Sequence, residues 1–485
     1  MAIRTRKDVW KLDEWDPILI WYARAIADMK GRKFVQPQSW RYQAAIHDYA
    51  ARPDQNTSDP PPPQLEQDKY WKQCQHFSWF FLPWHRMYLA YFEQIVGDTI
   101  VRLGGDPNWA LPYWNYSDAS NPNARKLPPA FIADKMPDGA LNPLRVAARD
   151  AGNDGEEVTD ARGVDISNCL GEPHFEADPP GGAVGFGGPR TGFKHTVVPG
   201  ESNRVGSLEQ TPHGDIHSDI GGWMGYFNTA GLDPIFWLHH CNIDRLWEVW
   251  LRRDTVNHKN PTDPAWLTAV TFKFHDAQGA EVSMTPSQVV DTTASPLFYD
   301  YQDVSDPLPA QPALESVTVM SMGERPIPEM VGATAAPLNL AGQAATAQFI
   351  STPPTGPART TESVGTPPRV ILNFENITAK GAPRGYYVYL NLPEGADPEK
   401  HPDLYAGSLP LFGIGPASDP TESHAGDGLH YALDVTDVVQ KLESRNAWKP
   451  NDVRVTFVPK PSRSFTESVT APPGVQIGRI SLYVS

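Results

Sequence analysis

The sequence has few cysteines, no long apolar run and no cluster of basic residues. Its three cysteines, Cys74, Cys169 and Cys241, cannot build a disulfide framework, and their odd number fits a reducing compartment. No segment approaches the ~20 apolar residues of a membrane-spanning helix. The formal net charge of −16 makes nucleic acids and anionic membrane surfaces poor partners and leaves small neutral ligands open.

The amino terminus lacks the apolar core of an export signal. Its basic start is followed by Asp13, Glu14 and Asp16, which interrupt the apolar stretch. The sequence as written therefore predicts a cytoplasmic protein without a membrane span. It does not decide between a monomer and a homo-oligomer.

The composition changes once along the chain, near residue 305. Residues 1–305 are rich in tryptophan and histidine, whereas residues 306–366 are rich in Pro, Ala, Thr and Ser and low in charge, which is typical of a linker. Residues 367–485 contain short runs rich in Val, Ile, Tyr and Phe, which indicate β-strands. We therefore expect a mainly α domain, a linker and a small all-β, sandwich-like domain.

Several elements can be placed within these domains. Apolar residues at three- and four-residue spacings predict helices over residues 17–30 and 85–103. A third helix is predicted in DPIFWLHHCNIDRLWEVWLRR, where Asp233 is a suitable N-cap and Pro234 suits the first helical position. The expected strands of the last domain are RVILNFEN, GYYVYLNL, DVRVTFVP and GRISLYVS.

Six histidines stand in patterns that suit metal binding. They are His47 on a helical stretch, His76 with His85, and His213, His217 and His240. His213 and His217 are four residues apart, which places them on one helical face. Two surface histidines are the alternative interpretation of this pair. A zinc protease of the zincin class is disfavoured, because it needs glutamate directly after the first histidine and this chain has Gly214.

Two adjacent histidines, His239 and His240, lie in the third predicted helix. Neighbouring side chains on a helix point about 100° apart, so only one of the two is expected to face a given site. His240 is favoured because Asp244, one turn later, is placed to orient its imidazole. His85 has a comparable setting, with Glu93 nearby.

A set of neutral nitrogen ligands narrows the choice of metal. A carboxylate-bridged di-iron site needs ligating glutamates on its helices, and Mg²⁺ and Ca²⁺ prefer oxygen ligands. Imidazole-only coordination suits copper, zinc or nickel. The residue types alone leave these three open.

Two long segments carry most of these histidines. HFSWFFLPWHRMYLAYFE contains His76 and His85 and ends at Glu93, and DPIFWLHHCNID spans residues 233–244. They resemble the first and second copper signatures of the type 3 copper proteins, the family of tyrosinases, catechol oxidases and hemocyanins. LEQTPHGDIHSDIGGWMGYFNTAGLDPIFWLHH and FYDYQ are similar to plant polyphenol oxidases, and YYVYLNLPEG resembles their carboxy-terminal domain.

The resemblance implies a dicopper centre in a four-helix bundle. The two copper ions would be held by His47, His76 and His85 and by His213, His217 and His240. Such a pair takes two electrons from a catechol and passes them to dioxygen. The implied activity is therefore a copper-dependent oxidation of o-diphenols to o-quinones with reduction of dioxygen to water, and the implied partners are small phenols and dioxygen.

The resemblance also implies roles for residues around the copper ligands. In fungal tyrosinases and molluscan hemocyanins a thioether joins the second histidine to a cysteine two positions earlier, and CQH places Cys74 in that order before His76. A free buried thiol is the alternative. Glu209 matches an acid that positions a water for deprotonating a phenol, against the alternative of a solvated glutamate. Phe227 matches a bulky residue over one copper, against the alternative of a core aromatic residue.

Two positions depart from monophenol hydroxylases. Gly214 stands where an asparagine often helps to hold that water, and Ser218, after His217, is neither the arginine of some bacterial enzymes nor a bulky apolar residue. These departures argue against monophenol hydroxylation, the tyrosinase activity, but not against diphenol oxidation.

Two other functions stay open from the sequence. One is hemocyanin-like reversible oxygen binding, and the other is a zinc-loaded hydrolase. Carboxy-terminal domains in this family often cover the coppers, so the protein is expected to be latent until its linker is cut or the domain is displaced. Accessibility of the site to a catechol separates an oxidase from a carrier.

Overall fold

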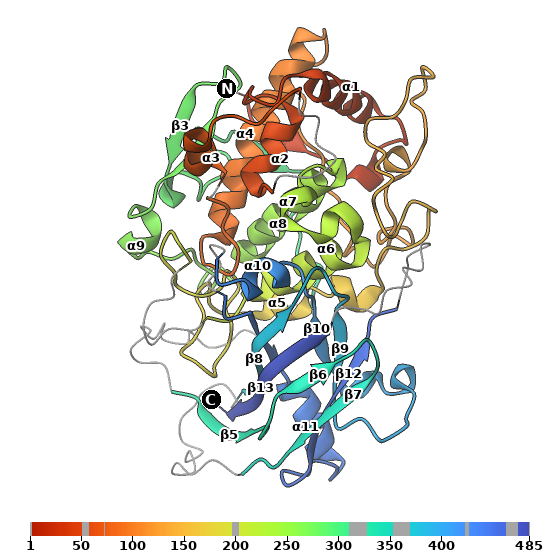
Figure 1. Cartoon of the computed structure of the whole chain (residues 1–485), viewed down its shortest axis with the longest axis vertical. Helices are drawn as coiled ribbons and strands as arrows, with labels where there is room; N and C mark the ends of the chain where they lie inside the picture. The colour runs from red at the N-terminus through yellow and green to blue at the C-terminus, as the bar shows by residue number, and fades with distance from the viewer. Residues whose placement is uncertain are drawn as a thin grey trace.

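A computed structural model describes residues 2–50, 58–71, 73–195, 203–309, 327–352, 369–421, 426–461 and 474–484. A helical part and a part built from two β-sheets lie against each other, with α10 (Ile414–Ser418) at the seam (Figure 1). The predicted fold class, a mainly α domain followed by a small β sandwich, is confirmed.

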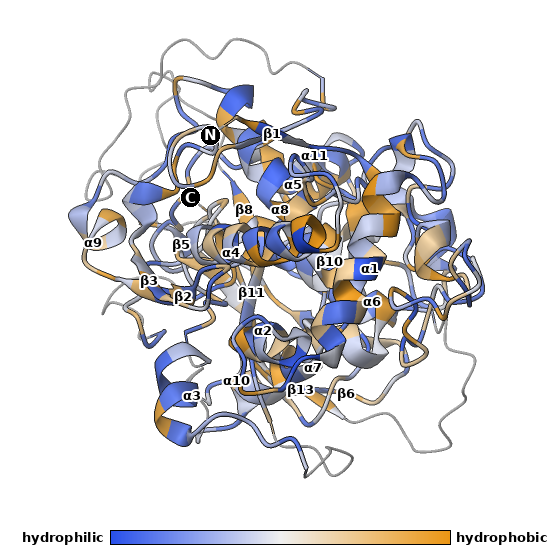
Figure 2. Ribbon diagram, turned by 90° about the horizontal axis from the view of Figure 1, so that it is seen from above, coloured by the Kyte–Doolittle hydropathy of each residue, from blue (hydrophilic) through white to orange (hydrophobic). Residues whose placement is uncertain are grey.

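The first part of the chain contains the long helices. Its helices are α1 (Pro17–Gly31), α2 (Trp40–His47), α3 (Gln64–Tyr70), α4 (Phe81–Arg102), α5 (Ser167–Gly171), α6 (Asp215–Ile220), α7 (Phe227–Ala230), α8 (Pro234–Arg253) and α9 (Pro264–Leu267). Helix α8 begins as predicted, because the Asp233 carboxylate accepts the Ile235 N–H and Pro234 opens the helix. Helix α4 begins at Phe81, four residues before the predicted start. Pro83 is tolerated there because backbone N–H groups in the first turn of a helix make no intrahelical hydrogen bond. Helices α4 and α8 pack together in the middle of the molecule (Figure 2).

The carboxy-terminal part is a sandwich of two antiparallel sheets. One sheet has the order β10 (Tyr405–Leu409), β9 (Tyr386–Leu390), β12 (Val453–Pro459), β7 (Ala345–Phe349). The other has the order β11 (Leu429–Asp434), β8 (Val370–Ala379), β13 (Val475–Val484), β5 (Glu329–Ala333), and β6 (Leu338–Leu340) also pairs with β13. Phe374 and Phe457, one from each sheet, meet with ring centroids 5.7 Å apart. Helix α11 (Thr436–Ser444) adds its Val438, Val439 and Leu442 to the same core.

The predicted linker is partly wrong. Residues 310–326 and 353–366 lie outside the described residues, but β5, β6 and β7 fall within the segment expected to be a linker and pair with β12 and β13. Val331, Leu340, Ala347 and Phe349 point into the sandwich core. The alternation of apolar and polar residues in these strands is short, and the low charge and high Ala and Thr content of the segment make it look like a linker in the sequence.

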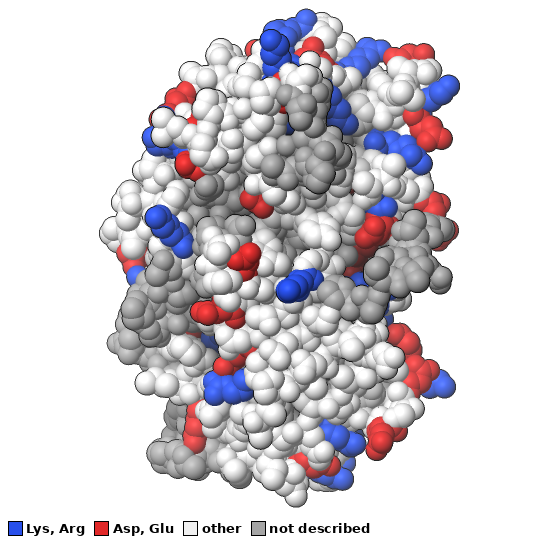
Figure 3. Space-filling view, in the orientation of Figure 1, with Lys and Arg blue, Asp and Glu red and all other residues white. Residues whose placement is uncertain are grey.

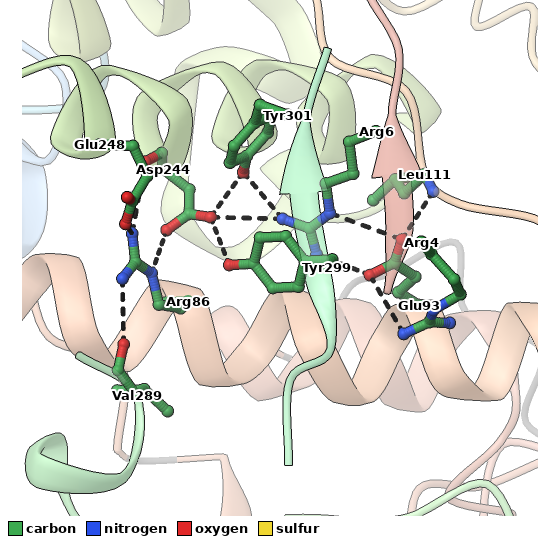
Figure 4. Close-up of polar contacts among 10 residues, drawn as sticks. All are labelled: Arg4, Arg6, Arg86, Glu93, Leu111, Asp244, Glu248, Val289, Tyr299 and Tyr301. Carbon is green, nitrogen blue, oxygen red and sulfur yellow. Dashed lines mark hydrogen bonds and ion pairs between the residues drawn. The ribbon is translucent and has the colours of Figure 1, made fainter. Parts of the chain in front are cut away.

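The two ends of the helical part are joined by a buried charge network (Figure 4). Strand β1 (Arg4–Arg6) runs parallel to β4 (Tyr299–Tyr301), with Arg6 opposite Tyr301. The Arg6 guanidinium binds the Glu93 carboxylate at 2.7 Å and the Asp244 carboxylate at 3.3 Å, and its carbon lies 3.6 Å from the centre of the Tyr299 ring. This network fixes β1 and β4 against α4 and α8. A separate hairpin, β2 (Phe272–His275) with β3 (Glu281–Met284), lies beyond α9.

Asp244 belongs to this network and not to the histidines. Its carboxylate accepts hydrogen bonds from Arg86 Nε and from the hydroxyls of Tyr299 and Tyr301, all at 2.5 Å. Burial alone would raise the pKa of Asp244, but Arg86 and Arg6 bring it below its usual range. The expectation that Asp244 orients His240 is therefore wrong, because two arginines and two tyrosines occupy its oxygens.

The network predicts a strong stability effect at Asp244. In the Asp244→Asn variant, Arg6 and Arg86 keep their buried positive charges without this partner, so the free energy of unfolding should fall by about 3–5 kcal/mol. Asp138→Asn is the matched control, because its pair with Arg24 at 3.5 Å is exposed and should contribute less than about 1 kcal/mol. Thermal and urea unfolding measure both changes. Equal losses in the two variants would contradict the role given to the network.

The surface shows no concentration of one charge on the face in view. Basic and acidic side chains are scattered among uncharged ones there (Figure 3). Within the described ranges, no helix is long and apolar enough to cross a membrane.

Candidate metal centre

Two groups of buried side chains with metal-binding atoms lie next to each other in the helical part. The first consists of His47, Cys74, His76 and His85, whose ligand atoms all lie within 4.8 Å of one another. His47 ends α2 and His85 lies in the second turn of α4, while Cys74 and His76 come from the segment before α4. The fold thus brings together the three histidines predicted for the first metal.

The second group consists of His213, His217, His239 and His240, again within 4.8 Å. The Nε2 atoms of His217 and His240 are 3.4 Å apart, close to the ~3.3 Å expected for two nitrogens that share one tetrahedral metal ion at ~2.0 Å. The rings of His85 and His240 stack with centroids 4.5 Å apart, so the two groups adjoin. His239 was expected to point away, yet it belongs to this group.

Backbone carbonyls fix the orientation of four of the imidazoles. In each of these rings, Nδ1 lies 2.8–3.1 Å from a carbonyl oxygen. The pairs are His47 with Phe227, His85 with Phe81, His213 with Glu209, and His217 with Met224. A carbonyl only accepts, so we assign the ring proton to Nδ1 and the free lone pair to Nε2. The Nε2 atoms of His47 and His213 have no hydrogen-bond partner within the described chain. Such carbonyl contacts are the usual outer-shell support of metal-bound histidine.

Five of the six predicted ligands, His47, His85, His213, His217 and His240, are neutral at ordinary pH. Burial lowers the pKa of His47 to about 4 and that of His213 to about 3. Burial, and then the neighbouring imidazoles, hold the pKa values of His85, His217 and His240 well below the usual range. Each of these five rings therefore has a lone pair available, and the donor set fits copper.

Aromatic side chains enclose these imidazoles. Phe227 stacks on His76 at 4.2 Å, Phe236 lies 4.3 Å from His240, and Trp84 and Phe81 lie 4.7 and 4.6 Å from His85. These rings keep water from the metal-binding nitrogens. Phe227 is thus both a core aromatic residue and a residue over the first group, and its carbonyl also orients His47.

Cys74 lies beside the ring that it was predicted to modify. Its Sγ is 3.4 Å from Nδ1 of His76 and 3.9 Å from Nε2 of His85. Burial raises the pKa of this thiol well above its usual range. Cys169 and Cys241 are also buried and reduced, and neither belongs to a metal-binding group of the described residues.

Glu209 connects the two groups through backbone contacts. Both of its carboxylate oxygens accept the Phe77 N–H, at 2.9 and 3.0 Å, and its carbonyl accepts from Nδ1 of His213. It is only 3% exposed, so the alternative of a solvated glutamate is wrong. Burial raises the pKa of Glu209 well above its usual range.

Gly214 and Ser218 both face the β domain. A Cβ atom on Gly214 would lie 2.9 Å from Cγ of Pro410, so a larger residue here would collide with the β domain in this arrangement. Ser218 is half-buried and lines a cavity of about 150 Å³ between the two domains, together with Tyr226 and Lys460.

The β domain inserts one side chain into the centre. Phe412 stacks on His217 with centroids 3.8 Å apart and planes 4° apart, and it meets His213 and Phe227 edge-on. Gly413 follows with φ +80°, and a Cβ there would lie 2.3 Å from Cζ of Phe227, so only glycine lets Phe412 enter. Sequence reasoning missed Phe412, because nothing in LPLFGIG marks it as a neighbour of the histidines.

A buried ion pair closes the seam beside Phe412. Lys460 of the β domain binds the carboxylates of Asp215 and Asp219, with 2.9 Å between its Nζ and Oδ2 of Asp219. The Ser408 hydroxyl donates to Asp215 at 2.6 Å. Burial would lower the pKa of Lys460, but the two carboxylates raise it above its usual range. Both aspartates flank His217 on α6, so the seam is fixed at the metal centre.

Comparisons with known proteins agree with this arrangement. Residues 37–253 match the family model of the common central domain of tyrosinase, and residues 260–311 match the polyphenol oxidase middle domain. Tyrosinase HcTyr1 of Hahella sp. (strain CCB-MM4) is 35% identical over 499 residues, which cover 99% of each chain. This chain belongs to the tyrosinase family. Residues 327–485 match a domain family of unknown function.

Other members of the tyrosinase family extend the match to plants. Chloroplastic polyphenol oxidase of Vitis vinifera is 34% identical over 263 residues, 48% of this chain and 38% of that protein. The structure of latent apple tyrosinase has a TM-score of 0.62 at 25% identity and covers all of this chain and 98% of that one. A structure of latent aurone synthase (polyphenol oxidase) shares the fold, with a TM-score of 0.64 at 23% identity, and covers 100% of this chain and 89% of that one. The resemblance to type 3 copper polyphenol oxidases with a plant-like carboxy-terminal domain is confirmed, and the family is one of copper oxidoreductases that act on phenols and oxygen.

Proposed function

We propose that this protein is a latent polyphenol oxidase that oxidises o-diphenols to o-quinones and reduces dioxygen to water. The observation that carries the proposal is the pair of adjoining, buried histidine groups, which would hold one copper ion each. When bound, copper supplies one-electron changes, so a pair matches the two electrons that a catechol gives up. The name of the Hahella relative, a tyrosinase, supports the same class of reaction.

The surrounding residues would bind and orient the phenol. Neutral imidazoles leave the charge of the metal ions uncompensated, which favours an approaching phenolate. The face of His217 that Phe412 covers is flat and apolar, and it would accept the aromatic ring of a substrate. Glu209, held by the Phe77 N–H, would position the water that takes the phenolic proton. Gly214 provides no side chain to assist, so we expect monophenols to be slower substrates than catechols.

Latency follows from the position of Phe412. The ring of Phe412 occupies the space over His217, and the Lys460 ion pair holds the β domain in place. A catechol therefore reaches the centre only after the β domain is displaced. Cleavage within residues 306–328, between the two domains, is one means of displacing it.

Oxygen uptake tests this function directly. We expect the copper-loaded full chain to consume little oxygen with catechol, and to consume it rapidly after limited proteolysis between the domains, with phenol slower than catechol. Uptake with neither substrate, before or after cleavage, would overturn the oxidase. Reversible oxygen binding without turnover would favour a carrier, and ester or peptide hydrolysis by the zinc-loaded protein would favour a hydrolase.

We also propose that Cys74 and His76 form a thioether in the copper-loaded protein. The short distance between Sγ and the imidazole favours it. The bond replaces one S–H and one ring C–H, and the two protons and two electrons pass to dioxygen. The peptide that contains residues 74–76 should be two hydrogens lighter in a mass spectrum after copper loading in air, but not after zinc loading. Cys74→Ser should abolish the change, and a free alkylatable thiol after copper loading would contradict the crosslink.

A further inference from the structure

His239 is a fully buried histidine whose surroundings differ from those of an ordinary core residue. Neither of its ring nitrogens has a hydrogen-bond partner within the described ranges. His258 shows the ordinary case, because it stacks on Trp250 at 4.4 Å and its Nδ1 lies 2.7 Å from the Trp250 carbonyl. A buried imidazole without partners loses its hydrogen bonds to water without compensation, so it calls for another kind of ligand.

The contacts of His239 point to the second histidine group. Its ring lies 5.4 Å from that of His213 and 4.8 Å from that of His217, measured between centroids. A nitrogen of His239 lies within 4.8 Å of the ligand atoms of His213, His217 and His240. Four imidazoles therefore surround one metal position where three were predicted.

His239 and His240 occupy different sides of this position. His240 stacks on His85 and so lies between the two groups, whereas the ring neighbours of His239 are the second group and Tyr116, at 5.7 Å. Tyr116 belongs to the wall of a cavity of about 940 Å³ in the helical part. Phe412 makes ring contacts with His76, His213, His217 and Phe227. Within the described residues it makes no ring contact with His239.

We propose that His239 is an auxiliary ligand that holds the second copper ion with His213 and His217 when His240 is not bound to it. Phe412 covers His217, whereas the ring beside His239 outside the second group is that of Tyr116, so the two histidines of α8 present their nitrogens to the metal position from different surroundings. His240 then completes the site next to the first group. The inference rests on the proposed function in one respect, that the second group binds copper.

Copper binding to the full-length, metal-free protein tests this role without measuring activity. The variants are His240→Phe, His239→Phe and the double variant, since phenylalanine keeps the ring packing and removes the nitrogens. After titration with Cu(I) and removal of free metal, wild type and His240→Phe should both retain two copper ions per chain, and the double variant should retain one. The dissociation constant of the second ion in His240→Phe should rise at least tenfold when His239→Phe is added.

Spectroscopy separates ligation from packing. The Cu(II) form of His240→Phe should show nitrogen hyperfine splitting from the second site that disappears in the double variant. His258→Phe is the matched control, because it removes a buried imidazole outside both groups and should leave copper binding unchanged. If His239→Phe does not fold, His239→Leu replaces it with the same expected result.

The outcomes are distinct. If His240→Phe retains a single copper ion whether or not His239 is present, the auxiliary role is overturned. If wild type binds no copper at all, the proposed function fails instead.

Discussion

The Phe412→Ala variant should oxidise small catechols without being cut. Removal of the ring leaves a space over His217 with the shape of one benzene ring, which is the size of a catechol. In wild type, a substrate must displace a buried, stacked phenyl group, whose burial and stacking contribute about 2–4 kcal/mol. The catechol oxidase activity of the uncut protein should therefore rise about 30- to 700-fold, towards the level of the cut protein.

Phe412→Leu is the matched control for this result. Leucine keeps an apolar side chain in the same place, so the uncut Phe412→Leu protein should remain nearly inactive, while both variants reach the activity of wild type after proteolysis. Oxygen electrode traces with catechol and with a bulky diphenol measure the difference. If Phe412→Ala stays as inactive as wild type before cleavage, Phe412 is not what blocks the site.

The Lys460→Met variant should open the seam itself. Methionine keeps the length of the side chain but leaves the buried carboxylate of Asp215 and the half-buried carboxylate of Asp219 without their cation. Breaking a buried ion pair costs about 3–5 kcal/mol. This cost destabilises the closed position of the β domain relative to the open one, because both aspartates are hydrated again when the β domain moves away. The equilibrium should shift towards the open form by roughly two to three and a half orders of magnitude.

Two measurements follow the opening in Lys460→Met. The uncut protein should oxidise bulky as well as small catechols, unlike Phe412→Ala, and a protease should cut between the domains faster than in wild type. Lys400→Met is the control, because Lys400 is exposed and its pair with Asp397 at 3.8 Å joins two residues of the β domain. A Lys460→Met protein that loses thermal stability but gains no activity would mean that the ion pair supports the fold and does not hold the closed state.

Much of the centre could be predicted because its residues stand in local motifs. His213 and His217 lie near one helix, His76 and His85 flank the start of another, and the motif beginning DPIF sets the start of α8 by its cap. Those signals depend on spacing along the chain. The family resemblance then joined the motifs into one site.

The features that sequence reasoning missed depend on contacts between distant segments. Asp244 turned out to bind Arg6, 238 residues away, and Phe412 reaches His217 from another domain. His239 was set aside by the rule that adjacent helical side chains diverge. The rule fails here because His213 and His217 belong to a different segment of the chain, and their rings lie beside both His239 and His240 of α8.

The pairing of β1 with β4 gives the helical part the topology of a nearly closed ring. Its first strand and its last strand are neighbours, and Arg6 ties both of them to α4 and α8. Both terminal strands of the helical part are therefore held by contacts within that part, and a cut between the domains should not release them. The same neighbouring ends make this part a natural candidate for circular permutation.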